Sequence, residues 1–181
     1  MHRDIKPSNV LISKEGDVKI IDFDLADFLN PTTRYQYAVA TRGFKPPEIQ
    51  LYQTDYDYRF DTYSAGALMA SILFQSSNYF GFMKEEEAWH CTTLKRGVKA
   101  LKAIDKLDAI DDDYVLENKH IEAVPIFDEW KEMALVDKSE FPKYEEAFDL
   151  LEKLLALDYT ERPMAIDALK HPFFEGVGKK S

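Results

Sequence analysis

The first 24 residues, MHRDIKPSNVLISKEGDVKIIDFD (residues 1–24), decide the fold of this chain. Two short apolar runs, at residues 10–12 and 18–21, flank the turn-forming sequence SKEGD at residues 13–17. β-Branched runs separated by such a cluster are typical of a β-hairpin. We therefore expect a small hairpin whose two ends bring residue 9 close to residue 22.

Polar side chains gather at both ends of this hairpin. Asp4, Lys6 and Asn9 precede the first apolar run, and Asp22 follows the second. Two carboxylates, an amide oxygen and an ammonium group suit phosphoryl transfer, because they offer oxygen ligands for Mg²⁺, a cation for the phosphate and a carboxylate for a hydroxyl. A single carboxylate such as Asp4 is otherwise a helix cap or a surface group, so spacing alone leaves both interpretations open.

Beyond the hairpin, the sequence predicts a mainly α fold with a small β-hairpin, in one domain over residues 1–181. Residues 23–47 lack periodicity and indicate a long functional loop. The apolar segment 61–74 predicts a helix buried on all sides, with Asp61 as its N-cap. Further helices are expected over residues 47–52, 85–104, 126–136, 144–157 and 163–171.

Composition excludes several classes of protein. The longest nearly apolar stretch spans residues 65–74. It is far shorter than the roughly 20 residues that a helix needs to cross a bilayer. The formal net charge of −10 argues against a nucleic-acid or anionic-membrane surface. The first residues hold no apolar signal segment, and Cys91 is the single cysteine. The sequence therefore predicts a cytoplasmic or nuclear protein that binds neither nucleic acid nor membranes.

Several motifs follow one another in the order found in protein kinases. HRDIKPSN at residues 2–9 resembles the catalytic loop HRDxKxxN, and Asp22-Phe23-Asp24 resembles the metal-binding DFG. PPE at residues 46–48 stands where kinases have APE. DTYSAG at residues 61–66 resembles the DxWSxG opening of their central helix. These matches identify the chain as similar to the C-terminal lobe of a eukaryotic protein kinase.

The resemblance extends to a subfamily. Residues 40–48 are similar to the segment that cyclin-dependent, MAP and casein kinase II types share, and residues 146–174 most resemble the casein kinase II catalytic subunit. It implies that residues 23–48 form the activation segment and that residues 61–74 form the central helix. Little similarity is visible over residues 80–140.

The same resemblance implies a role for each matching residue. Asp4 would be the catalytic base, and Lys6, the serine/threonine-type lysine, would contact the γ-phosphate of ATP. Asn9 and Asp22 would hold Mg²⁺. Leu11 and Ile21 would form an apolar floor under adenine. Thr41, Arg42 and Lys45 would line the pocket for the substrate residue that follows the phosphorylated one. Structural support would come from His2, Glu48, Asp61 and Arg162, with Glu48 and Arg162 as a buried pair.

The partners implied are protein substrates with Ser or Thr, acidic flanking residues in those substrates, and a regulatory subunit. Basic residues at 42 and 45 are common to many relatives, and Ala38 stands where casein kinase II types carry a further arginine. Acidic preference is therefore one interpretation of this pocket and not the only one. Asp24 departs from the glycine of DFG, which raises the question whether that position needs a positive φ angle.

The glycine-rich loop and the strand lysine of kinases do not occur in these 181 residues. We therefore expect the N-terminal lobe to be missing and the isolated chain to be inactive, with Met1 an internal methionine taken as a start. Two alternatives stay open, namely a catalytically dead kinase-like binding module and a truncated gene product without function. An upstream reading frame with a glycine-rich loop would separate the first possibility from the others.

Overall fold

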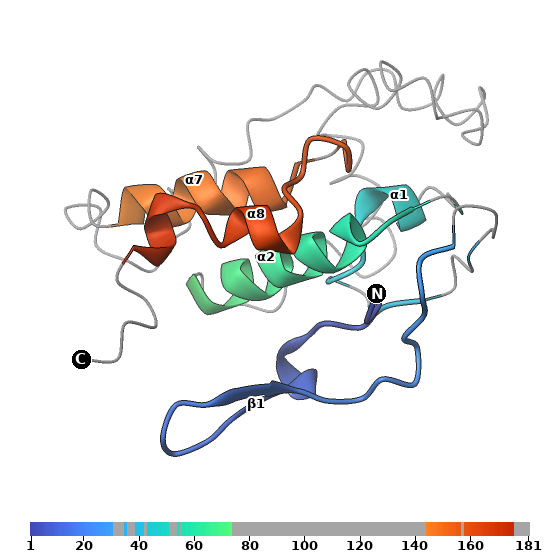
Figure 1. Ribbon diagram of the computed structural model, residues 1–181, viewed down its shortest axis with the longest axis horizontal. Helices are drawn as coiled ribbons and strands as arrows, with labels where there is room; N and C mark the ends of the chain where they lie inside the picture. The colour runs from blue at the N-terminus through green and yellow to red at the C-terminus, as the bar shows by residue number, and fades with distance from the viewer. Residues whose placement is uncertain are drawn as a thin grey trace, which may run out of the picture.

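The computed structural model describes residues 1–30, 35, 39–41, 43–50, 54, 56–73, 144–156 and 158–175. A hairpin near the N-terminus extends away from a layer of packed helices (Figure 1). The helices expected over residues 85–104 and 126–136 lie outside the described residues, as does the region of little similarity between residues 80 and 140. In the part of the chain that is described, no helix has the length and apolarity to cross a membrane.

The predicted hairpin is present. The strands β1 (Val10–Ile12) and β2 (Val18–Ile20) are antiparallel, with Leu11 opposite Lys19. The turn between them contains Gly16 at a φ of 87°. This is a left-handed conformation that glycine adopts without steric cost. A short 3₁₀ helix η1 (Pro7–Asn9) leads into β1, and the Ile21 N–H donates to the Asn9 carbonyl at 3.0 Å. The two ends of the hairpin therefore lie side by side.

The helical layer is built from α1 (Pro47–Gln50), α2 (Arg59–Leu73), α7 (Glu145–Leu154), α8 (Ala165–Ala168) and the 3₁₀ turn η3 (Pro172–Phe174). Helix α2 packs against α7 (Figure 1). Gly66 allows their close approach, because a Cβ atom there would lie 2.8 Å from the Leu154 Cβ. The core between the two helices consists of buried Phe44, Tyr63, Ala67, Ala70, Phe148, Leu151 and Leu155.

The prediction that Asp61 caps the central helix is wrong. Helix α2 begins two residues earlier, at Arg59, and the Arg59 N–H donates to the Asp57 Oδ1 at 2.8 Å. Asp57 therefore satisfies an N–H group at the start of the helix. Asp61 lies within the first turn, and its carboxylate is bound to the backbone of residues 2 and 3 instead.

The prediction that the central helix is buried on all sides is also wrong within the described residues. Ile72, near the C-terminal end of α2, is 68% exposed. The buried face combines the aromatic residues Phe60 and Tyr63 with small and polar residues, while the apolar Ile72 lies outside it. Its buried residues are Phe60, Thr62, Tyr63, Ser64, Gly66, Ala67 and Ala70.

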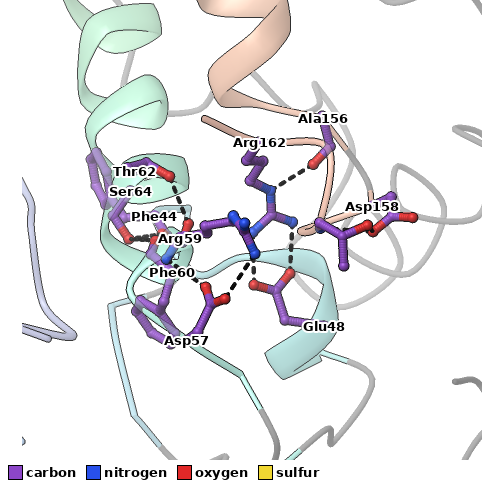
Figure 2. A network of polar contacts seen from close by, with 11 residues as sticks. Phe44, Glu48, Asp57, Arg59, Phe60, Thr62, Ser64, Ala156, Asp158 and Arg162 are labelled. Carbon is purple, nitrogen blue, oxygen red and sulfur yellow. Dashed lines mark hydrogen bonds and ion pairs between the residues drawn. The ribbon is translucent and has the colours of Figure 1, made fainter. Parts of the chain in front are cut away.

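A buried ion pair joins α1 to the segment that follows α7. The Arg162 Nη1 and Nη2 each donate to one oxygen of Glu48, both at 2.7 Å, and the Arg162 Nε donates to the Ala156 carbonyl (Figure 2). The Arg162 guanidinium also lies over the Tyr63 ring, 4.8 Å from its centroid. The side chains of Arg162 and Glu48 are 0% and 3% exposed. Each buried charge therefore depends on the other for compensation.

Candidate active site

The backbone of residues 2–4 is held by the first turn of α2. The N–H groups of His2 and Arg3 donate to the two carboxylate oxygens of Asp61 at 2.6 and 2.9 Å. Arg3 has a φ of 67°. This is the left-handed region, which a residue with a side chain rarely occupies. Such a conformation persists where its surroundings fix it, and Asp61 supplies that fixation from the helix.

His2 connects this loop to the segment after β2. Its Nδ1 accepts the Asp4 N–H at 3.2 Å, and its Nε2 lies 3.0 Å from the Ile21 carbonyl oxygen. Since a neutral imidazole has one accepting and one donating nitrogen, the ring proton is on Nε2, which donates to Ile21. The imidazole also packs edge-on against the Phe23 ring, with 4.8 Å between ring centroids. Both ring nitrogens are engaged with the backbone, which fits a supporting role and not proton transfer.

The Asp4 carboxylate is the centre of a polar network. Its Oδ2 accepts from the Lys6 Nζ at 2.6 Å and from the Asn9 Nδ2 at 3.2 Å. Its Oδ1 accepts from the Thr41 hydroxyl at 2.6 Å and from the Thr41 N–H at 3.0 Å. Lys6 also donates to the Thr41 Oγ1 at 2.8 Å. A carboxylate, an ammonium group and a hydroxyl are therefore in mutual contact.

The electrostatics of the network keep Asp4 ionised. Burial by itself raises the pKa of Asp4, but the hydrogen bonds from Lys6 and Thr41 outweigh it and hold the pKa below its ordinary value of 3.8. Asp4 is therefore a carboxylate at neutral pH. It is able to accept a hydrogen bond from a hydroxyl, as it does from Thr41, while Lys6 places a positive charge beside the same oxygen atoms.

Asn9 and Asp22 lie at the junction of the two hairpin ends. The Asn9 Nδ2 donates to the carbonyl and the carboxylate of Asp4, so neither of these bonds uses the amide oxygen Oδ1. The Asp22 carboxylate is exposed, and it follows directly after Ile21, whose N–H is bound to the Asn9 carbonyl. The structure thus brings Asp4, Lys6 and Asn9 into direct contact, and Asp22 follows the residue whose N–H is bound to the Asn9 carbonyl.

These two oxygen donors fit Mg²⁺. Magnesium in proteins typically binds one or two carboxylate or amide oxygens and completes its shell with phosphates and water. Among the described residues no group of three or more His, Cys, Asp or Glu forms a metal cage. An amide oxygen and a carboxylate are donor types that such a metal takes alongside phosphates.

The predicted adenine floor and substrate pocket are only partly described. Leu11 and Ile21 lie on the hairpin and are 52% and 38% exposed. Lys45 is half-buried, and burial lowers its pKa. Arg42 lies outside the described residues. Thr41 contacts Asp4 and Lys6 directly, a role that spacing did not predict because 37 residues separate it from Asp4.

Asp24 sits in a turn that does not require glycine. The Ala26 N–H donates to the Phe23 carbonyl at 2.9 Å, which closes a β-turn with Asp24 and Leu25 at its centre. Among the described non-glycine residues, a positive φ occurs at Arg3, Asp22 and Ala40, and not at Asp24. A turn with negative φ at both central positions accepts most residues, so Asp replaces glycine here without backbone strain.

Comparisons with known proteins show which family the chain is similar to. The family model described as "Protein kinase domain" matches residues 1–174. The chain is 33% identical over 180 residues to a protein of Encephalitozoon cuniculi (strain GB-M1) named "Probable casein kinase II subunit alpha homolog". The match covers 97% of this chain and 53% of that relative, so the chain spans about half the relative's length. On the family match, which runs from the loop around Asp4 to the 3₁₀ turn η3, this chain belongs to the protein kinase family.

Proposed function

We propose that this chain is the C-terminal catalytic lobe of a serine/threonine protein kinase, which transfers the γ-phosphate of ATP to protein hydroxyl groups. Membership of the family implies a phosphotransferase that acts on proteins and uses ATP with a divalent metal. One observation carries the proposal. The ionised Asp4 carboxylate and the Lys6 ammonium lie 2.6 Å apart, and both contact a hydroxyl, that of Thr41.

In this proposal Asp4 orients the hydroxyl of the substrate and accepts its proton as the oxygen bonds to the γ-phosphorus and the bond from that phosphorus to the departing ADP breaks. Lys6 stabilises the negative charge on the phosphoryl group in transit, at a site where the charge is already positioned before the reaction. Thr41 bridges the two, so it keeps their side chains in register. Groups that are held in place before the reaction lower its entropic cost.

Asn9 and Asp22 would hold Mg²⁺ against the phosphates. The metal would supply charge neutralisation on the phosphate oxygens. The role of the chain is to present the two oxygen donors in a fixed geometry. The Asn9 amide is fixed by its two hydrogen bonds to Asp4, and the Ile21 N–H bond to the Asn9 carbonyl keeps Asp22 close.

Activity is proposed to require a further lobe that covers the hairpin. Large apolar side chains are exposed on and just after it, and adenine needs an apolar cover on both faces. The chain spans about half the length of its relative, which is consistent with a lobe supplied by additional sequence. The exposed residues are Leu11, Ile12, Val18, Ile20, Ile21, Phe23, Leu25 and Phe28.

The proposed substrates carry Ser or Thr followed by an acidic residue. The name of the relative supports serine/threonine specificity, and Lys45 and Arg42 would supply the positive charge that favours an acidic neighbour. A regulatory subunit is proposed on the same resemblance. Ala38, where the subfamily carries arginine, makes the expected acidic preference moderate.

The test joins this chain to the N-terminal lobe of the E. cuniculi relative and measures phosphate transfer from radiolabelled ATP. A peptide array presents Ser, Thr and Tyr acceptors, each followed by Asp, Glu, Ala or Pro. We expect labelling of Ser and Thr, with Asp and Glu favoured at the following position. Labelling of Tyr alone would contradict serine/threonine specificity, and a folded chimaera without any transfer would favour the catalytically dead binding module.

A further inference from the structure

The Arg3 side chain is not part of the polar network around Asp4, yet it is almost fully buried. Its Nε donates to the Leu25 carbonyl at 2.6 Å and its Nη1 donates to the Tyr56 hydroxyl at 3.3 Å. Its Nη2 lies 3.4 Å from the Asp27 Oδ2, and the guanidinium lies 6.0 Å from the centre of the Tyr35 ring. The residue just before Asp4 is therefore anchored by its side chain.

Tyr56 is the most deeply buried of these anchors. Its ring packs between those of Tyr35 and Phe60, with centroids 5.1 and 5.2 Å away. Since Phe60 belongs to the first turn of α2, the phenol is fixed to the same helix that holds the backbone of residues 2 and 3 through Asp61. Burial raises the pKa of Tyr56 and favours the neutral phenol, whose oxygen accepts from Arg3.

This arrangement controls a strained residue. Arg3 has a left-handed backbone, and such strain is maintained only when contacts on more than one side fix it. Asp61 fixes the Arg3 N–H, and Leu25, Tyr56 and Asp27 hold its side chain. Loss of the Tyr56 contact removes one of these anchors and so weakens the hold on the backbone. Asp4 is the next residue, so relaxation moves its carboxylate relative to Lys6 and Thr41.

We propose that Tyr56 is a positioning residue, whose hydroxyl anchors Arg3 and thereby orients Asp4. The inference rests on the proposed function insofar as Asp4 acts on a substrate hydroxyl. Tyr56 itself does not touch the reacting groups. Its effect is transmitted through Arg3 to the loop that carries Asp4, Lys6 and Asn9.

The experiment compares Tyr56→Phe with Tyr58→Phe in the 181-residue chain. Both variants lose one phenolic oxygen, but Tyr58 is 42% exposed and serves as the matched control. NMR of ¹⁵N-labelled protein follows hydrogen exchange at the Arg3 Nη–H groups, which include the donor to Tyr56, and the amide signals of residues 4–9. We expect exchange at Arg3 to become about tenfold faster in Tyr56→Phe, with displaced signals for residues 4–9, because a hydrogen bond to a charged group is lost. Tyr58→Phe should change neither.

These readouts separate positioning from a purely structural role. A purely structural role of Tyr56 would lower the midpoint of unfolding but leave the native-state NMR signals of residues 4–9 in place. Unchanged Arg3 exchange and amide signals in folded Tyr56→Phe would overturn the proposal. If Tyr56→Phe does not fold, the wild-type chain still tests the anchor. The contact requires a nuclear Overhauser effect between the Tyr56 ring protons and the Arg3 guanidinium protons. Absence of that effect would refute the anchor.

A second arm uses the chimaera with the N-terminal lobe. Tyr56→Phe should lower kcat several-fold with KM for ATP unchanged, since the variant misplaces Asp4 and leaves nucleotide binding intact. A wild-type chimaera that transfers no phosphate would reject the proposed function, while the NMR arm would still decide the role of Tyr56. An active chimaera in which Tyr56→Phe keeps full kcat would reject the positioning role alone.

Discussion

The contact between α2 and α7 allows a sharp test of the packing. Gly66→Ala adds one methyl group at the point where the two helices are closest. The new Cβ would lie 2.8 Å from the Leu154 Cβ and 3.1 and 3.2 Å from two side-chain carbons of Leu155. A Cβ atom is attached to the backbone and does not rotate away, so relief requires a shift of α7 against α2.

Two effects of opposite sign then compete. Alanine has the higher helix propensity and favours the folded state by about 1 kcal/mol relative to glycine. Overpacking a tight core costs about 1–3 kcal/mol, and contact with a backbone-linked atom places this site toward the upper end. We therefore expect a net loss of about 1–2 kcal/mol in the free energy of unfolding.

Urea unfolding followed by circular dichroism measures the difference, with Glu152→Ala on the exposed face of α7 as the control. The control should change the free energy of unfolding by less than about 0.5 kcal/mol. A Gly66→Ala variant as stable as the wild type, or more stable, would refute the reasoning, because helix propensity would then outweigh a contact that the structure does not accommodate.

Three further predictions follow from single features. Glu48→Gln removes the carboxylate charge that faces the buried Arg162 guanidinium and should destabilise the fold by about 3–5 kcal/mol in urea unfolding, and a loss below about 1 kcal/mol would contradict a buried pair. Asp24→Gly should lower the free energy of unfolding by up to about 1 kcal/mol, because Asp24 has no positive φ angle that glycine would relieve. A clear gain in the midpoint of thermal unfolding would show that the Asp24 backbone is strained. Because the pKa of Asp4 is depressed in the folded state, its contribution to stability is fully present above its ordinary pKa of 3.8 and is lost as the pH falls through the lower folded value. Asp4→Asn should therefore flatten the loss of stability as the pH falls below 3.8, and identical pH profiles for the variant and the wild type would exclude this linkage.

The sequence predicted those parts of the fold that local patterns control. The hairpin follows from two β-branched runs around a turn cluster that ends in Gly16-Asp17. Helix α7 follows from apolar residues at spacings of three and four, which form one face toward α2. The order of motifs around Asp4 and Asp22 predicted the family, because each motif keeps its spacing within one local segment.

Contacts between distant segments were not predictable in the same way. Asp61 looked like a helix cap, because Asp is a common cap and the apolar run begins after it. Its carboxylate instead binds N–H groups of residues 2 and 3, which are 59 and 58 residues away. Thr41 reaches Asp4 across 37 residues, and Tyr56 reaches Arg3 across 53. Periodicity carries no information about such pairs, because they depend on how segments far apart in the sequence pack together.

The central claim, that Asp4 acts on the substrate hydroxyl during phosphoryl transfer, is tested most directly by the rate of the chemical step. Rapid-quench measurement of the first turnover compares Asp4→Asn with Asp17→Asn, the same change in the exposed hairpin turn, both in the chimaera with the N-terminal lobe. Because Asp4 would act as general base and would position the hydroxyl, Asp4→Asn should lower the rate of the first turnover by at least about 100-fold. Asp17→Asn should change that rate little. A first turnover at the wild-type rate in a folded Asp4→Asn chimaera would contradict the account.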